Sequence, residues 1–286
     1  MMYELVMTIA SNAMGRAIAG CQERNIGDYA AASRQFKAAA GVMQYLAEDQ
    51  IPKWTSRSGD SHSIELPSEA KLESCGAFKT LFLAVGQQMA VATALSKPGS
   101  PNWSLLAKLC LGISEQMTLF VSTMSSTASL GMAKIDPFLF ALARFQIKFQ
   151  SALSLYFLAR SVWESKVSPG LAIAMLTEAI ALMKGQDYYN KEGLPKMDQK
   201  NLTEDATQLR KHMKDLVKSW ERDNSSIFFE SVPSAVPENA KLRQGLFMMK
   251  PEPYSLTDDV EPVLLMLPAR KSALSPLSSF LWGKKK

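Results

Sequence analysis

The spacing of apolar and polar residues predicts a chain built from helices. Between Gly27 and Asp49, apolar residues recur every three or four positions and fill two faces instead of one. Asp28 stands where an N-cap is expected, and alanines occupy many of the other positions. Alanines let neighbouring helices approach closely. This segment is therefore predicted to be a scaffold helix, packed on two sides, in an all-α fold.

The same spacing recurs along most of the chain. The predicted helices span residues 3–22, 27–48, 68–96, 102–122, 137–165, 169–184 and 203–222. The first two are joined by a short turn, which predicts an antiparallel hairpin. We expect stacked antiparallel helix pairs similar to a TPR array, although no clean repeat of about 34 residues is present.

The pattern changes after Asp223. Prolines and short apolar runs replace the helical spacing, and Leu246–Pro251 looks extended and could pair as a short β element. From about residue 256 the chain is rich in Pro and Ser. The sequence therefore predicts a domain over residues 1–255 and a disordered tail over residues 256–286.

Charge changes this picture only in the tail. The chain has 32 Lys and Arg against 27 Asp and Glu, a net charge of +5, and no acidic residue follows Glu261. The basic residues after that point are Arg270, Lys271, Lys284, Lys285 and Lys286. They account for the whole excess, so the body is neutral and nucleic acid is not an expected partner.

The sequence offers little catalytic or metal-binding chemistry. Cys21, Cys75 and Cys110 are widely spaced in apolar helical runs and are predicted to be buried free thiols in a reducing compartment. Two histidines are too few for a His-based metal site, and Walker, GxGxxG and GxSxG motifs are missing. We therefore expect no metal, no cofactor and no enzymatic activity. No secretory signal and no apolar run of transmembrane length is expected either.

Two stretches resemble the Bro/Alix domain family. Asp223–Pro233 (Asp-Asn-Ser-Ser-Ile-Phe-Phe-Glu-Ser-Val-Pro), followed by Leu246–Pro251, resembles the closing segment of the Bro domain. The stretch Ala39–Leu46 (Ala-Ala-Gly-Val-Met-Gln-Tyr-Leu) resembles the family's Ala-rich helix. The resemblance covers about residues 1–255 and implies a curved, TPR-like array of antiparallel helices.

The chain departs from the family pattern in two places. The small β-sheet and first helices of the family have no counterpart, so a truncated domain, a short isoform or a fragment is expected. Apolar surface on residues 3–22 and on the Ala-rich helix should then be uncovered. In addition, Phe228 and Phe229 stand where the family often has Tyr-His, so any role of that hydroxyl, including phosphorylation, is lost.

The family implies a non-enzymatic adaptor that binds the C-terminal amphipathic helix of ESCRT-III subunits on a hydrophobic patch. Ser104–Leu109 resembles the family's Ala-Ile-Ile-Ala-Lys-Leu and assigns the patch to Leu105 and Leu109. Ala90 and Val91 align with a family aromatic, and these smaller residues predict a shallower pocket. Both leucines lie beside the apolar stripe of their helix, so the alternative is that they are simply core. The resemblance further implies a cytoplasmic protein recruited peripherally to endosomes and multivesicular bodies for protein sorting.

Two other possibilities stay open. The tail could contact an anionic endosomal membrane, or it could be a disordered solubilising segment. The residues concerned are Arg270, Lys271, Trp282, Lys284, Lys285 and Lys286. The domain could instead be a helical scaffold that regulates a small GTPase or a soluble receptor through its concave face, since the rhophilins of this family are GTPase partners.

Overall fold

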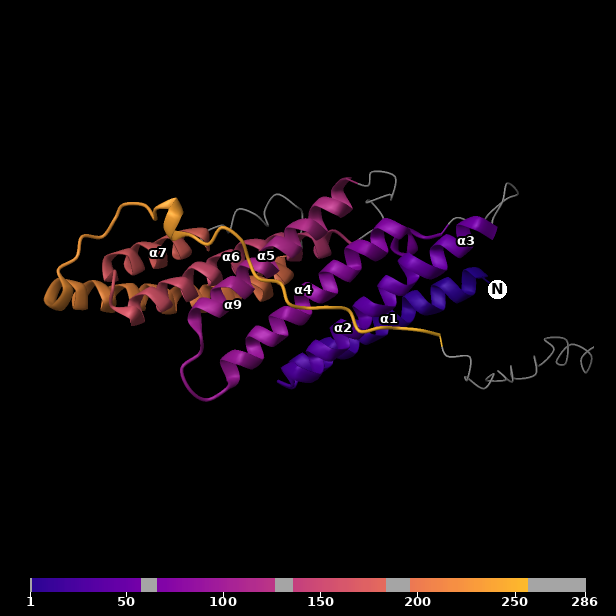
Figure 1. Ribbon diagram of the computed structural model, residues 1–286, viewed down its shortest axis with the longest axis horizontal. Coiled ribbons are helices and arrows are strands. Elements are labelled where there is room, and N and C mark those ends of the chain that lie inside the picture. Colours follow the sequence, from indigo (N-terminus) through magenta and orange to yellow (C-terminus); the bar gives the residue numbers. More distant parts are fainter. Residues whose placement is uncertain (1, 58–65, 127–135, 184–195, 257–286) are drawn as a thin grey trace, which may run out of the picture. The chain divides into compact units, whose positions relative to one another are not determined.

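Every regular element in the part of the chain that the structure describes is a helix. The computed structural model describes residues 2–57, 66–126, 136–183 and 196–256 (Figure 1). The helices are α1 (Met2–Asn25), α2 (Tyr29–Tyr45), α3 (Ile51–Arg57), α4 (Leu72–Ser96), α5 (Trp103–Ser126), α6 (Pro137–Ser165), α7 (Pro169–Leu182) and α9 (Lys196–Asp223). Short π turns cover Leu46–Gln50 and Asn224–Phe228, and 3-10 turns cover Ser68–Ala70 and Glu238–Ala240. The all-α prediction is confirmed, and Leu246–Pro251 is neither helix nor strand.

Each long helix packs mainly on the next one in sequence. The order of packing runs from α1 through α2, α4, α5 and α6 to α7, and α9 packs on α7. Side-chain caps fix where two of these helices begin: Asp28 Oδ1 accepts the Ala31 N–H at 2.8 Å, and Asn102 Oδ1 accepts the Leu105 N–H at 3.0 Å. The N-cap predicted at Asp28 is therefore present.

The chain stays helical beyond the end that the sequence predicts for the second helix. After α2, the π turn Leu46–Gln50 leads directly into α3, where a loop was expected. Gln50 is buried in this turn and its Nε2 donates to the Tyr45 hydroxyl at 2.7 Å. Pro52 is the second residue of α3, directly after the π turn, and the chain stays helical through it.

The expectation that apolar surface on the Ala-rich helix α2 is uncovered is wrong. Its residues 39–43 are all buried, with α1 and α4 on two sides. A third side is covered by the segment 229–254, which we call the strap; it runs back over the helices (yellow-orange in Figure 1). On α1, the described residues expose one large apolar side chain, Ile18. The expectation of uncovered faces rested on the missing N-terminal part of the family domain and did not take the strap into account.

The strap crosses the helices where they carry glycines. A Cβ at Gly170 of α7 would overlap the Ser231 carbonyl, one at Gly112 of α5 would overlap the Leu246 backbone, and one at Gly41 of α2 would overlap the Glu252 carbonyl. These three glycines form notches that admit the strap's backbone. The compact unit that the strap completes ends at Tyr254.

The start of the strap is fixed by one buried amide. Asn224 Nδ2 donates to the Glu230 carbonyl at 2.8 Å, and its Oδ1 accepts the Glu230 N–H at 3.2 Å. The Glu230 carboxylate in turn accepts the Gly170 N–H at 2.9 Å, at the start of α7. A negative group is favourable at a helix N-terminus. The Asp223–Pro233 stretch therefore builds the turn that directs the strap onto α7.

Helices α4 and α5 are long and apolar enough, by length and composition, to cross a membrane. The expectation that no apolar run reaches this length is wrong. Half of the most apolar window of each helix is buried inside the domain. A core helix passes the same test, so the finding is weak evidence for a membrane span.

One of the three cysteines does not fit the predicted burial. Cys75 and Cys110 are buried, whereas Cys21 is exposed. Burial raises the pKa of the Cys75 and Cys110 thiols to about 12. Both core thiols are therefore protonated and unreactive at neutral pH.

Candidate partner-binding surface

The N-terminal turn of α5, which carries Leu105, is anchored on α6. Trp103 Nε1 donates to Glu164 Oε1 at 2.6 Å, and the Arg160 guanidinium lies 4.6 Å from the centre of the Trp103 ring. The same ring stacks on Phe157. These contacts hold the helix end rigidly. Leu105 follows in the same turn and is 40% exposed, so its side chain is presented on a fixed backbone.

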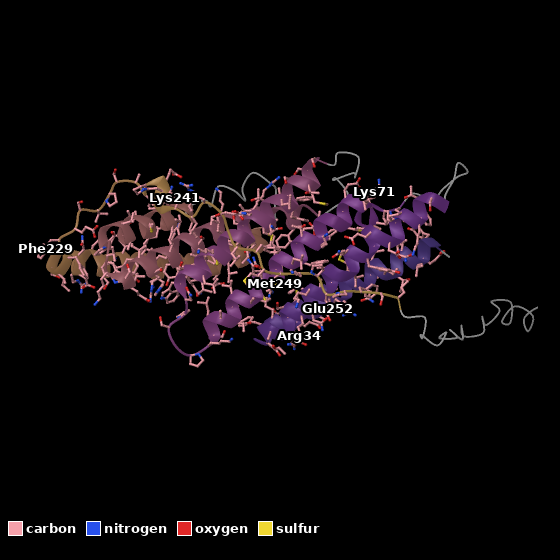
Figure 2. All side chains as sticks on the ribbon, in the orientation of Figure 1. Arg34, Lys71, Phe229, Lys241, Met249 and Glu252 are labelled. Atoms are coloured by element: carbon pink, nitrogen blue, oxygen red, sulfur yellow. The ribbon has the colours of Figure 1, made fainter. Side chains whose placement is uncertain are left out.

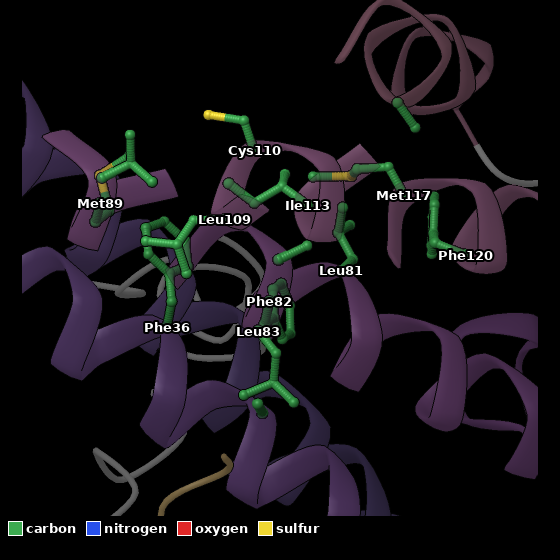
Figure 3. Packing of buried hydrophobic residues seen from close by; sticks show 14 of the residues in the cluster. Phe36, Leu81, Phe82, Leu83, Met89, Leu109, Cys110, Ile113, Met117 and Phe120 are labelled. Carbon is green, nitrogen blue, oxygen red and sulfur yellow. The ribbon is translucent and has the colours of Figure 1, made fainter. Parts of the chain in front are cut away.

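Leu109, one turn further along α5, is buried. Its side chain is 9% exposed and belongs to the core cluster, where Figure 3 shows it among the side chains labelled around Phe36 and Met89. Its carbonyl accepts Gln87 Nε2 of α4 at 3.0 Å. The expectation that Leu105 and Leu109 are exposed together therefore holds for Leu105 and is wrong for Leu109.

The strap crosses α5 next to Leu109. The Leu246 N–H donates to the Lys108 carbonyl at 2.8 Å, and the same Gln87 Nε2 donates to the Leu246 carbonyl at 2.9 Å. Gln87 Oε1 accepts the Met248 N–H at 2.9 Å. A fully buried amide thus joins α4, α5 and the strap with every group paired.

The residues aligned with the family aromatic also divide between surface and core. Val91 is 6% exposed, and Ala90 is half-buried on α4. Of the four residues predicted to bind a partner, Leu105 is exposed, Ala90 is partly accessible, and Leu109 and Val91 belong to the core. Their role in binding stays a prediction.

The strap adds two apolar residues that the sequence did not assign to the site. Leu246 is 37% and Met248 is 61% exposed. Leu246 is bonded to Lys108, one helical turn from Leu105, and Met248 is bonded to Gln87. We call Leu105, Leu246 and Met248 the α5–strap surface. The continuous apolar run Leu246–Met249 was the available signal, but it does not say which of its residues face outward.

One hollow among the described residues is mainly apolar. A cavity of about 150 Å³ lies between α5, α6, α7 and the strap, lined mainly by leucines. Ser154 Oγ donates to the Ala107 carbonyl at 2.8 Å, and Lys241 Nζ is paired with Glu178 at 2.7 Å and with Glu238 at 3.2 Å. These polar groups are thus engaged elsewhere. In the described part of the chain, no three His, Cys, Asp or Glu side chains gather in a group that could hold a metal ion.

The basic tail residues Arg270, Lys271, Trp282, Lys284, Lys285 and Lys286 lie outside the described residues. Their contact with a membrane stays a prediction.

Comparison with known proteins identifies the family. The model of the BRO1-like domain matches this chain over residues 9–266. The chain belongs to the BRO1-like domain family. The match extends beyond the predicted domain end at residue 255. The two stretches that resemble the family meet in the structure. Glu252, directly after Leu246–Pro251, crosses α2 at Gly41, which lies within Ala39–Leu46.

Solved structures show the same fold. The structure described as "ALIX BRO1 CHMP4C complex" is 15% identical, with a TM-score of 0.69 over 89% of this chain and 64% of that chain. The structure described as "Structure basis for endosomal targeting by the Bro1 domain" is 17% identical, with a TM-score of 0.67 over 88% of this chain and 62% of that one. ALIX in complex with the SIVmac239 PYKEVTEDL late domain matches at 14% identity and a TM-score of 0.69, over 93% of this chain and 34% of ALIX.

The chain thus spans less than two thirds of the BRO1 chains it matches. A search of curated protein sequences finds no match.

Proposed function

We propose that this chain is a non-enzymatic adaptor that binds the C-terminal amphipathic helix of an ESCRT-III subunit. The observation that carries the proposal is Leu105, an apolar side chain exposed at the position where the family resemblance assigns the partner patch. It is presented on an anchored helix end and extended by Leu246 and Met248 of the strap. The fold shared with an ALIX BRO1–CHMP4C complex, which contains an ESCRT-III subunit, supports the same partner class.

The mode of binding is an amphipathic helix laid on a hydrophobic surface. Each of the three apolar residues of the α5–strap surface is only partly exposed, so covering it contributes about 1 kcal/mol. The buried Leu109 adds nothing directly, and the small Ala90 leaves a shallow contact. We therefore expect weak binding, on the order of micromolar or weaker.

The adaptor would act in endosomal and multivesicular-body sorting, as a cytoplasmic protein recruited to endosomes, with a curved TPR-like scaffold as its frame. The structure described as endosomal targeting by the Bro1 domain supports this setting. Contact of the basic tail with anionic endosomal membrane would add a second, electrostatic attachment.

The test compares Leu105→Asp with Leu119→Asp. Leu119 is 50% exposed on the same helix but lies near its other end, so it is a matched control. We expect Leu105→Asp to reduce the affinity for an ESCRT-III C-terminal helix peptide at least tenfold by isothermal titration, with Leu119→Asp unchanged. Both variants should keep the helical circular dichroism. Equal affinities of the two folded variants would refute the assignment.

A change at Leu109 is not informative here. Because this side chain is buried in the core, an aspartate there would place a charge in an apolar environment and unfold the domain.

A further inference from the structure

Helix α9 has a basic face opposite the face that packs on the domain. Its buried side holds Met213 and Trp220, and the Trp220 ring stacks on Trp163 of α6 with ring centres 4.4 Å apart. Residues three or four positions apart share one side of a helix. At this spacing the exposed side of α9 carries four basic residues, which we call the α9 basic stripe: Lys211, Lys214, Lys218 and Arg222.

No ion pair neutralises the α9 basic stripe within the described part of the chain. None of its four side chains forms an ion pair or a hydrogen bond with a described residue. The other charged residues between positions 207 and 223 are Arg210, Asp215, Glu221 and Asp223. This part of α9 is therefore positively charged overall.

The spacing of the stripe also works against the helix. Lys214, Lys218 and Arg222 follow one another at intervals of four residues, where like charges destabilise a helix. An arrangement that costs helix stability, and that the domain does not neutralise, favours an anionic partner outside the domain.

The end of α9 to which the stripe leads is apolar and exposed. The π turn Asn224–Phe228 follows the helix directly, and Ile227 and Phe229 are exposed there. Figure 2 shows Phe229 at this end of the domain, far from the labelled strap residues Met249 and Glu252. The φ of Phe229 is 56°, which is unusual for a bulky side chain, so an aromatic ring is held in the solvent by a strained backbone. Such strain clusters at functional positions.

A second turn brings another apolar side chain to the same end. Val167 is exposed in the turn between α6 and α7. On one side of it, Trp163 meets the Phe228 ring edge-on at 5.7 Å, and on the other side the Gly170 N–H donates to the Glu230 carboxylate at 2.9 Å. The two turns are therefore fixed to each other. We call Val167, Ile227 and Phe229 the apolar tip.

The chemistry of the tip selects among anionic partners. Aromatic side chains can stack on nucleic-acid bases, but the aliphatic Val167 and Ile227 cannot. Aliphatic and aromatic side chains both gain from burial at the boundary between lipid headgroups and acyl chains. Arg222 precedes Ile227 by five residues, about 8 Å along a helix, so headgroups bound by the stripe would lie close to the tip.

We propose that the α9 basic stripe and the apolar tip bind the surface of an anionic membrane. The stripe contacts the lipid headgroups, and the tip inserts at their boundary with the acyl chains. This site lies on the folded domain and is separate from the basic tail. It does not rest on the proposed binding of an ESCRT-III helix.

The stripe is tested with the full chain and vesicles of phosphatidylcholine and phosphatidylserine. Lys214→Gln with Lys218→Gln should weaken flotation binding at least about tenfold, since each basic residue near an anionic surface strengthens binding about fivefold. The matched control is Arg34→Gln with Lys97→Gln, the same charge change at two other exposed positions. It should weaken binding less than about threefold, because only long-range attraction is lost. Vesicles of phosphatidylcholine alone should bind at least about tenfold more weakly than the mixed vesicles.

The tip is tested by Phe229→Asn. Asparagine tolerates the left-handed backbone, so this change removes the apolar ring without adding strain. It should weaken binding to the mixed vesicles at least about threefold, at low and at high salt, because burial of an apolar ring is not screened. Ile18→Asn, at an exposed position of α1, should leave binding unchanged.

Three results would overturn the proposal. The first is unchanged vesicle binding by either the Lys214→Gln, Lys218→Gln variant or Phe229→Asn. The second is loss of binding only when Lys284, Lys285 and Lys286 are changed to Gln, which would assign the membrane contact to the tail. The third is binding of an RNA oligonucleotide but not of vesicles. The α9 variants should keep their affinity for the ESCRT-III peptide, and Leu105→Asp should keep vesicle binding, so the two proposals fail separately.

Discussion

The glycine notches make a direct prediction at Gly41. This residue lies in the middle of α2, where alanine is intrinsically more favourable than glycine by about 1 kcal/mol. The structure predicts the opposite sign for Gly41→Ala, because the added Cβ would overlap the Glu252 carbonyl of the strap. The strap must then lift from α2.

The loss of stability is estimated from the contacts that break when the strap lifts from α2. The hydrogen bond from the Glu252 N–H to the Lys37 carbonyl contributes about 1 kcal/mol, and overpacking in a filled site costs about 1–3 kcal/mol. The edge contact between Tyr45 and Tyr254, with ring centres 5.3 Å apart, is also disturbed. After the gain in helix propensity, Gly41→Ala should lower the free energy of unfolding by about 1–3 kcal/mol.

Gly15→Ala is the matched control. Gly15 is also inside a helix, but a Cβ there meets no atom within 4 Å. It should raise the free energy of unfolding by up to about 1 kcal/mol. Urea unfolding measures both changes, and amide exchange at Glu252 reports the strap locally. If both alanines stabilise the protein equally and Glu252 exchange is unchanged, the close contact at Gly41 does not exist.

Four further predictions concern buried groups and strain. Gln87→Leu leaves the Leu246 carbonyl and the Met248 N–H without their partner and should lower the free energy of unfolding by about 3 kcal/mol in urea, whereas an unchanged value would refute the amide junction. A maleimide should label Cys21 alone in the native protein, and rapid labelling of Cys75 or Cys110 would contradict their burial. The pKa of the Cys75 and Cys110 thiols is about 12 in the folded protein against 9.0 for a free thiol, so the unfolded chain loses these protons first as the pH rises. The free energy of unfolding should therefore fall as the pH rises from about 9 to 12, by up to about 1.4 kcal/mol per pH unit for each thiol. A Cys75→Ala, Cys110→Ala variant should show a smaller slope. Phe229 has a φ of 56° and is 75% exposed, so Phe229→Gly should not destabilise the protein in a thermal melt, and a loss above about 1 kcal/mol would refute strain at this turn.

The helices could be predicted because their cause is local. Apolar spacing and the cap at Asp28 lie within the segments they organise, and the structure shows the cap bond to Ala31. Where the cause is a distant segment, sequence reasoning failed. Leu105 and Leu109 have the same side chain, four residues apart on one helix, yet one is exposed and the other buried. Leu109 lies among core side chains such as Phe36 of α2 and Met89 of α4, which are distant from it in the sequence.

The same reason explains the errors at α2 and at Cys21. An alanine-rich face can be covered by a helix or by an extended strap, and residues 39–41 give no sign of which until the position of Glu252 is known. Cys21 lies near the edge of the apolar stripe of α1, where a small rotation of the helix decides whether a side chain is buried. Helical spacing therefore fixes which residues share a face, but the packing partner decides how far burial extends around the helix.

The central claim is that an ESCRT-III helix docks on the α5–strap surface, and methyl NMR tests it most directly. With Leu and Met methyl groups labelled, titration with an ESCRT-III C-terminal helix peptide should shift the signals of Leu105, Leu246 and Met248. The methyl signals of Leu119, exposed at the far end of α5, should stay in place. Saturable binding that leaves Leu105 and Met248 unshifted, or no binding at all, would contradict the account.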